Sequence, residues 1–249
     1  MAEPEIIYED ESLLAVNKPA GLLVHGVAAR GKRSASPERE QGPAETTLVD
    51  WLLKRYPEVK TVGEKPEERP GIVHRLDKGT SGVMLVAKTQ TCFDYLKNLF
   101  RSHQIKKGYL VLVHGEVKPK QGIIKKPIGL KSGTTKRSVY SEKFAKEAKT
   151  NYKVIKYFTS EGKKIFSLLD VIPETGRTNQ IRVHLASIHH PVVGDSLYGL
   201  RKEPRWASRL MLHAESIEFT LRSGRRLRIE AEPPKEFWSI IGGLSRHIS

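Results

Sequence analysis

The sequence contains a single cysteine, Cys92, and no long apolar run. One cysteine excludes an intramolecular disulfide, a zinc site built on a CxxC pair and thiol–disulfide exchange within the chain. No stretch reaches the roughly 18 to 20 apolar residues that a membrane helix needs, and the acidic start MAEPEIIYED lacks the pattern of a signal or transit peptide. These absences predict a cytoplasmic protein with no membrane partner. Because the apolar residues around Cys92 have helical spacing, we also expect a buried structural thiol there.

Acidic residues are too few to balance the basic ones: 28 Asp and Glu stand against 43 Lys and Arg, a formal net charge of +15. This surplus predicts a polyanionic partner, nucleic acid first, although a basic surface that only aids solubility is the alternative. The cations gather in four stretches, KKPIGLKSGTTKR, KFAKEAK, RKEPRWASR and RSGRRLR. Several fall in expected loops or hairpin tips, so we expect them to contact phosphates around a cleft. For any one stretch, a solvated surface is the alternative.

The strand and helix patterns that are present are typical of an α+β protein. Strands are predicted over 6–10, 13–18, 21–25 and 106–115, with hairpins over 150–173 and 211–234. Helices are predicted over 46–57 with Thr47 as N-cap, 89–103, 178–188 with Thr178 as N-cap, and 236–244. Strands outnumber helices and many neighbours join through hairpins, so the predicted sheet is largely antiparallel.

Residues 27–46, VAARGKRSASPEREQGPAET, have little apolar content and several Gly, Pro and Ser residues. This composition predicts a long mobile surface loop. A linker between two domains is the alternative, which the short chain before the segment disfavours. The length of 249 residues then predicts one domain over 1–249. With no heptad pattern, we expect a monomer.

The stretch HRLDKGTSG, His74 to Gly82, precedes the apolar run VMLVAK, which reads as a strand. Such a loop commonly presents a reactive side chain at the edge of a sheet, although Asp77 and its glycines also suit an ordinary turn. Arg75 and Lys78 flank Asp77 in sequence, so we expect its carboxylate to stay ionised and to accept hydrogen bonds only. That state favours a nucleophile or a base over a general acid.

HRLDKGTSG resembles the signature loop of the RluA family of pseudouridine synthases. Three further blocks resemble that family in the same order: NKPAGLLVH, KKGYLVLVHG and ETGRTNQIRVHLASIHHPVVGDSLYG. The resemblance implies the pseudouridine synthase fold, with a mixed, largely antiparallel central sheet flanked by helices. It implies a catalytic domain without a separate N-terminal RNA-binding domain. It also implies an isomerase that converts uridines of structured ribosomal or transfer RNA to pseudouridine, without a cofactor or a metal.

The resemblance further implies a role for individual residues. Asp77 matches the catalytic aspartate, which attacks either the ribose or the base. Tyr109 matches the tyrosine that packs on the target base and is placed to remove the C5 proton, and Arg182 matches the basic residue that pairs with the aspartate. Arg75 matches an arginine that fills the gap left by the displaced nucleotide. Further RNA contacts are expected from His74, Lys78 and Arg177, with His74 supporting the loop rather than transferring protons.

These roles agree with the chemistry of the residue types. A carboxylate stabilises or traps the positive charge that develops on ribose when the glycosidic bond breaks, and a guanidinium holds a carboxylate with parallel hydrogen bonds. Read without the resemblance, Tyr109 is a core or sheet-face tyrosine and Arg182 a surface arginine. The sequence departs from the family at Asn179, where His is usual, and at His189, where Gly is usual; neither position is expected to do chemistry.

Two other functions fit the sequence less well. A non-catalytic RNA-binding or RNA-folding protein on the same scaffold would not need Asp77. A nuclease or glycosidase would need paired carboxylates, and Asp170, Glu174 and Asp195 have no evident partner role. His184, His189, His190 and His213 match no zinc spacing, so no metal site is expected.

Overall fold

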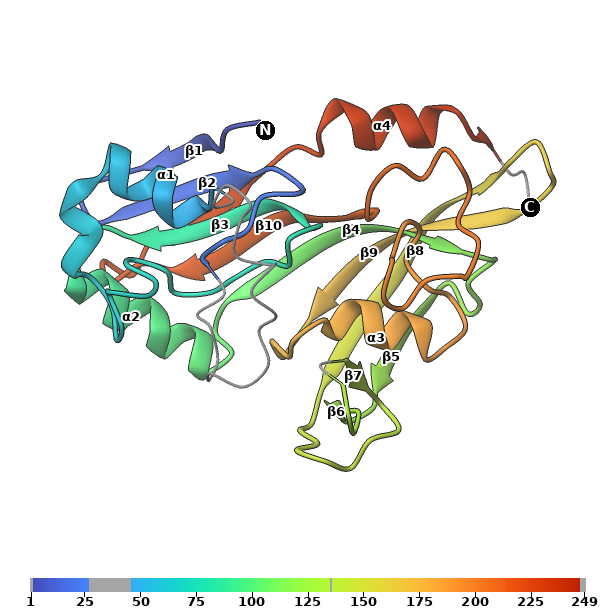
Figure 1. Cartoon of the computed structure of the whole chain (residues 1–249), viewed down its shortest axis with the longest axis horizontal. Helices are drawn as coiled ribbons and strands as arrows, with labels where there is room; N and C mark the ends of the chain where they lie inside the picture. Colours follow the sequence, from blue (N-terminus) through green and yellow to red (C-terminus); the bar gives the residue numbers. More distant parts are fainter. Residues whose placement is uncertain (1, 27–45, 135, 247–249) are drawn as a thin grey trace, which may run out of the picture.

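The computed structural model describes residues 2–26, 46–134 and 136–246, and its central feature is a ten-stranded sheet (Figure 1). The main path runs β1-β2-β3-β10-β4-β9-β8-β12, while β11 pairs with β10 and β5 with β8. Among the described strands of this sheet, β3 and β10 form the one parallel pair. The strands are β1 Glu5–Glu9, β2 Leu13–Lys18, β3 Ser81–Ala87, β4 Lys106–His114, β5 Gln121–Lys125, β8 Lys149–Thr159, β9 Ile165–Pro173, β10 Leu212–Thr220, β11 Arg226–Glu230 and β12 Ser245–Arg246. The predicted α+β class with a largely antiparallel sheet is confirmed.

Four α-helices, one 3₁₀-helix and a separate two-stranded ribbon complete the described chain. They are α1 Leu48–Arg55, η2 Pro57–Thr61, α2 Gln90–Arg101, α3 Gln180–Ala186 and α4 Lys235–Gly242, with the ribbon of β6 Gly129–Leu130 and β7 Arg137–Ser138. None of the helices in the described ranges is long and apolar enough to cross a bilayer.

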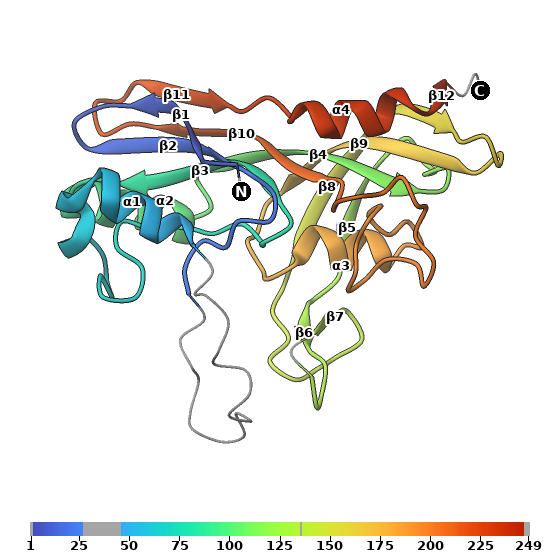
Figure 2. The same cartoon turned by 45° about the horizontal axis from the view of Figure 1, so that its top comes forward.

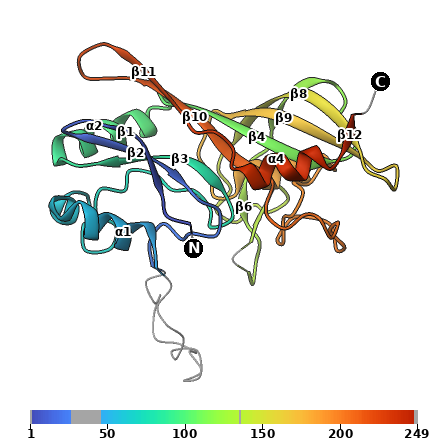
Figure 3. The same cartoon turned by 90° about the horizontal axis from the view of Figure 1, so that it is seen from above.

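Both faces of the sheet are covered at β3. In β3 all seven residues are buried: Met84 and Val86 pack with α1, and Val83 and Leu85, which point the other way, pack with α2. A strand covered on both faces is apolar throughout, which explains the uninterrupted VMLVA run. In the other half of the sheet α3 lies on the side away from α4 (Figures 1 and 2), and Figure 3 shows α4 running along the sheet. The loop before β3 is therefore anchored on a rigid strand.

Local sequence signals account for several of these elements. The Thr47 hydroxyl accepts from the Asp50 N–H, and the Asp50 carboxylate accepts from the Thr47 N–H at 2.8 Å, so the predicted N-terminus of α1 is confirmed as a capping box. The predicted helices over 89–103 and 236–244 and the hairpins β8–β9 and β10–β11 are also present. Cys92 is only half-buried, although burial raises the pKa of its thiol to about 11.

Other expectations were wrong. Residues 21–25 form no strand: Leu23 makes one isolated bridge to Thr47, and Gly21 turns the chain with a φ of +86°. The helix expected to end at Pro57 does end before it, at Arg55; Pro57 then begins η2, which was not foreseen, and neither was β5. The loop predicted over 27–46 lies, except for residue 46, outside the described residues.

Candidate active site

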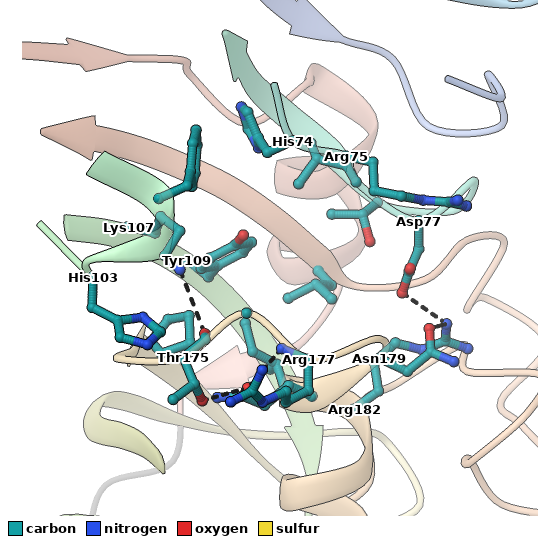
Figure 4. A pocket seen from close by; sticks show the side chains of 18 of the residues that line it. His74, Arg75, Asp77, His103, Lys107, Tyr109, Thr175, Arg177, Asn179 and Arg182 are labelled. Atoms are coloured by element: carbon teal, nitrogen blue, oxygen red, sulfur yellow. Dashed lines mark hydrogen bonds and ion pairs between the residues drawn. The ribbon is translucent and has the colours of Figure 1, made fainter. Parts of the chain in front are cut away.

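A pocket of about 600 Å³ opens where the loop before β3, strand β4 and the start of α3 meet (Figure 4). Asp77 and Thr80 come from the loop, and Tyr109 comes from β4, where it pairs with β9 and β10. Among the described residues that line the pocket, Asp77 is the one acid. The basic lining residues, apart from histidines, are Arg75, Arg101, Lys107, Arg177 and Arg182. The pocket therefore suits a polyanionic substrate and offers it one carboxylate.

Arg182 lies between two carboxylates. Its Nε and Nη2 atoms donate to Oδ2 and Oδ1 of Asp195 at 2.7 and 2.6 Å, and its Nη1 atom donates to Oδ2 of Asp77 at 3.1 Å. Arg182 is 7% and Asp195 2% exposed, whereas the Asp77 side chain is 27% exposed. Burial alone would lower the pKa of Arg182, but the carboxylates of Asp195 and Asp77 outweigh it and raise that pKa. Burial alone would raise the pKa of Asp195, but the Arg182 guanidinium outweighs it and lowers that pKa. Arg182 is thus a fixed cation that holds Asp77 at the pocket.

Asn179, the N-cap residue of α3, helps to fix the position of Arg182. The N-cap is Asn179 rather than the predicted Thr178, and its φ of 56° is in the left-handed region, which Asn tolerates better than most residues. Its Oδ1 atom accepts from Arg182 Nη1 at 3.1 Å, and its Nδ2 atom donates to the Tyr198 hydroxyl at 3.2 Å. The Arg182 guanidinium also lies 5.3 Å from the centre of the Tyr198 ring. A position that we did not expect to matter for chemistry therefore contacts the site.

Lys18, which is fully buried at the end of β2, stabilises the loop that carries Asp77. The Lys18 ammonium donates to the carbonyl oxygens of Pro19, Leu22 and Lys78 at 2.7, 2.9 and 3.3 Å. The N–H of Gly21 donates to the same Lys78 carbonyl at 2.8 Å. Burial, together with the charge of Arg209, lowers the pKa of Lys18 to about 7. Lys18 thus connects two loops that are 60 residues apart in sequence.

Tyr109 and His74 form part of the pocket wall as uncharged groups. Burial, with the negative charge of Asp77, raises the pKa of the Tyr109 phenol well above its ordinary value. His74 Nε2 accepts from the Leu85 N–H at 2.9 Å, and its ring stacks on Phe100 with 4.6 Å between centres. Burial, with the charge of Lys107, lowers the pKa of His74 to about 3, so the imidazole is neutral at physiological pH.

Cations surround this wall on several sides. Lys107 lies two residues before Tyr109 on β4 and is half-buried; its Nζ atom donates to the Thr175 carbonyl at 3.4 Å, and burial lowers its pKa to about 8. Arg177 donates from Nε to the Glu147 carbonyl at 3.0 Å. Arg75 is exposed at the rim, with Nη1 3.3 Å from Nε2 of His25.

Thr80 carries a polar atom that the protein does not satisfy. Thr80 is 2% exposed and lines the pocket, and its hydroxyl has no hydrogen-bond partner among the described residues. It is the one such buried side-chain atom in the described part of the chain. A buried hydroxyl without a partner costs about 1–3 kcal/mol, so this position is unfavourable for folding alone.

The structure brings six of the seven expected site residues to one pocket. They are His74, Arg75, Asp77, Tyr109, Arg177 and Arg182. Lys78 is not among the lining residues; its side chain is exposed, and its carbonyl serves the loop contacts described above. Sequence reasoning missed Lys18, Thr80, Lys107 and Asp195. A possible signal for Asp195 was its place in the block VVGDSLYG, 13 residues after Arg182.

Comparison with known proteins defines the class. The family model for RNA pseudouridylate synthase matches residues 12–187, and the chain belongs to that family. It is an RNA pseudouridine synthase, an isomerase, and the resemblance noted in the sequence is confirmed.

The relatives span most of the chain. An uncharacterized RNA pseudouridine synthase of Aquifex aeolicus is 40% identical over 97% of this chain and 73% of its own length. Ribosomal large subunit pseudouridine synthase D of Zymomonas mobilis is 37% identical over 93% of this chain and 70% of its own. The solved structure of human RNA pseudouridylate synthase domain containing 1 superposes with a TM-score of 0.74 at 24% identity, covering 98% of this chain and 89% of that one. This last match confirms the predicted fold.

Proposed function

We propose that this chain isomerises uridines of structured RNA through Asp77. The observation that carries the proposal is the Arg182–Asp77 ion pair in a pocket that Tyr109 helps to form and in which Asp77 is the one acid among several basic side chains. Relatives from Zymomonas mobilis and Nitrosomonas europaea are named for the ribosomal large subunit, so ribosomal RNA is the first substrate to test, with transfer RNA as the second.

Asp77 acts as the nucleophile in this proposal. The carboxylate attacks the ribose or the base, the N1 glycosidic bond breaks, and the base turns and rejoins the ribose through C5. Arg182 orients the carboxylate before the attack through its hydrogen bond to Asp77, while its two hydrogen bonds to Asp195 prevent the guanidinium from following the substrate. The isomerisation moves one proton from C5 and adds one to N1, so it consumes no acid or base overall.

Tyr109 packs on the uracil and takes the C5 proton in this proposal. The negative charge of Asp77 is one of the two causes that raise the pKa of the phenol, burial being the larger. Because the phenol is neutral at rest, Tyr109 gives its own proton to N1 of the base and takes the proton from C5 once the C5–ribose bond has formed, which restores the phenol.

The cations at the rim hold the displaced nucleotide. Arg75, exposed beside Asp77, occupies the gap that the target uridine leaves when it turns out of its stack. Arg177 and, outside the pocket, Lys78 contact phosphates, and His74 contributes the wall against which the RNA lies. We treat residues 1–249 as one catalytic domain that acts as a cytoplasmic monomer, without a metal or cofactor.

The test is release of tritium from RNA labelled at uridine C5. Ribosomal and transfer RNA transcripts are offered separately to the wild type and to Asp77→Asn, with Asp170→Asn on β9, outside the pocket, as the matched control. We expect release by the wild type and the control and a loss of at least about a thousandfold in Asp77→Asn, because the amide is a far weaker nucleophile.

The RNA affinity of the same variants separates catalysis from binding. Asp77→Asn should bind transcripts at least as tightly as the wild type, since it removes a negative charge from the RNA site. Release that is equal in Asp77→Asn and the wild type would refute the role of Asp77. Tight binding with no release from any transcript would favour an RNA-binding protein without catalysis.

A further inference from the structure

A lobe built around the β6–β7 ribbon projects from the body beside α3, on the side of the molecule away from α4 (Figures 1 and 2). We call residues 126–134 and 136–148 the basic lobe. It contains two acids, Glu142 and Glu147, against six cations: Lys126, Lys131, Lys136, Arg137, Lys143 and Lys146. Lys131, Lys136, Lys143 and Lys146 are exposed.

Two aromatic side chains of the basic lobe face solvent. Tyr140 is 82% exposed and Phe144 is 70% exposed. Phe144 adopts a φ of 53°, a left-handed conformation that is unfavourable for a large side chain, and its ring is nevertheless not buried. The Lys143 ammonium lies 6.0 Å from the centre of the Phe144 ring. Packing within the described chain therefore does not explain either ring.

Hydrogen bonds fix the basic lobe to the elements of the candidate active site. The Arg137 N–H donates at 2.9 Å to the hydroxyl of Tyr198, the residue that also contacts Asn179 and the Arg182 guanidinium. Arg177, which lines the pocket, donates to the Glu147 carbonyl at 3.0 Å. Lys126 donates to the Ser187 carbonyl at the end of α3, also at 3.0 Å. The lobe therefore has a fixed position relative to the pocket.

We infer that the basic lobe binds an unpaired segment of the substrate RNA that flanks the target uridine. Tyr140 and Phe144 stack on exposed bases, and the surrounding lysines contact the phosphates of the same strand. Paired bases hide their faces inside a helix, so exposed rings select unpaired RNA over duplex RNA. The net positive charge matches RNA, whereas lysines are depleted in protein–protein interfaces. The identity of the RNA rests on the proposed function; the stacking site does not.

The experiment compares Tyr140→Ala, Phe144→Ala and the double variant with Trp238→Ala. Trp238, 46% exposed on α4, is a solvent-facing aromatic outside the lobe and is the matched control. The probes are a fluorescein-labelled oligouridylate, an RNA duplex of the same length, and the ribosomal transcript. We expect each lobe substitution to weaken oligouridylate binding roughly tenfold, the double variant to weaken it further, and the control to bind as the wild type does.

Two further measurements give the inference its specificity. Duplex affinity should change less than oligouridylate affinity in the double variant. Replacing Lys131 and Lys143 by Ser should lower the salt dependence of oligouridylate binding by about 0.7 in the log–log slope for each lysine, whereas the aromatic variants should keep the wild-type slope.

Unchanged oligouridylate affinity in a folded double variant would overturn the inference, and the rings would then be assigned to a protein partner. An equal loss in Trp238→Ala would overturn it too, because the effect would not belong to the lobe. These outcomes are independent of the proposed catalysis: absence of tritium release from every transcript would refute the isomerase proposal, while the binding arms would still test the lobe.

Discussion

Arg182 separates a closed side, occupied by Asp195, from an open side, where Asp77 faces the pocket, and the two carboxylates differ in how many hydrogen bonds they accept. On the closed side, Asp195 accepts two hydrogen bonds from Arg182, and its Oδ1 atom also accepts the N–H groups of Leu197 and Tyr198 at 2.8 and 3.0 Å. On the open side, Asp77 accepts one bond of 3.1 Å from the same guanidinium, and its side chain remains 27% exposed. Arg182 thus contacts a structural carboxylate, Asp195, whose two oxygens both accept hydrogen bonds, and a second carboxylate, Asp77, that can still accept further hydrogen bonds.

The same contrast extends to the groups around Asp77. Thr80 has a buried hydroxyl without a described partner, and Lys107 makes a single long hydrogen bond of 3.4 Å. Tyr109 and Lys107 have shifted pKa values there, which is typical of sites that act on a substrate. The closed side contributes stability, and the open side keeps its hydrogen-bonding capacity for RNA.

Removing the charge on the closed side should have the largest effect on stability. Asp195→Asn removes the negative charge and one of the two acceptor oxygens that face the buried Arg182 guanidinium. We therefore expect a loss of about 3 kcal/mol in the free energy of unfolding. The freed guanidinium would shift toward Asp77, and tritium release should fall about a hundredfold. Urea unfolding and the tritium assay measure the two losses, and Asp170→Asn, the half-buried acid on β9, is the matched control.

The effect of pH on the Asp195 variant follows from the lowered pKa of Asp195. Its folded value is below that of the unfolded chain, so the contribution to stability is fully present at neutral pH. It is lost as the pH falls below about 4 toward the folded pKa. The stability difference between wild type and Asp195→Asn should therefore shrink in acid, and a difference that is constant down to acid pH would contradict the ion pair as its source.

The contrast also marks what the sequence could predict. Asp77, Tyr109 and Arg182 were expected from local blocks, and the α1 capping box from Thr47 and Asp50. Asp195 was given no role because its partner depends on how α3 packs against the turn after it. Lys18 was not singled out because its three carbonyl partners come from two loops. The missing partner of Thr80 is visible only when its surroundings are known. These properties arise from tertiary packing, which spacing along the chain does not encode.

A smaller effect is expected at Thr80, where stability and activity should change in opposite directions. Thr80→Val keeps the shape and removes the unpaired hydroxyl, so the free energy of unfolding should rise by about 1 kcal/mol. If the hydroxyl bonds to the uridine, kcat/KM in the tritium assay should fall about tenfold, equivalent to about 1.4 kcal/mol. Thr80→Ser, which keeps the hydroxyl, should retain most of the activity. Full activity in Thr80→Val would assign the hydroxyl no part in the reaction.

The smallest effect, a change in RNA affinity with pH, would sharpen the comparison on the open side. Burial lowers the pKa of Lys107 to about 8, and only the protonated ammonium attracts phosphate. We therefore expect the Kd for RNA to rise a few fold between about pH 7 and pH 9, as Lys107 loses the charge that attracts phosphate. Fluorescence anisotropy with the ribosomal transcript measures the change.

Two substitutions test whether Lys107 is the source of that change. Lys107→Arg should remove the pH dependence, because a guanidinium stays charged over the whole range. Lys106→Arg, at the exposed neighbouring position of β4, should leave the dependence as it is in the wild type. If both variants keep it, the titrating group is not Lys107, and the open side of the pocket binds RNA without this ammonium. If only Lys107→Arg removes it, a cation of the pocket is adjustable by pH while Arg182, held by Asp195, stays charged throughout.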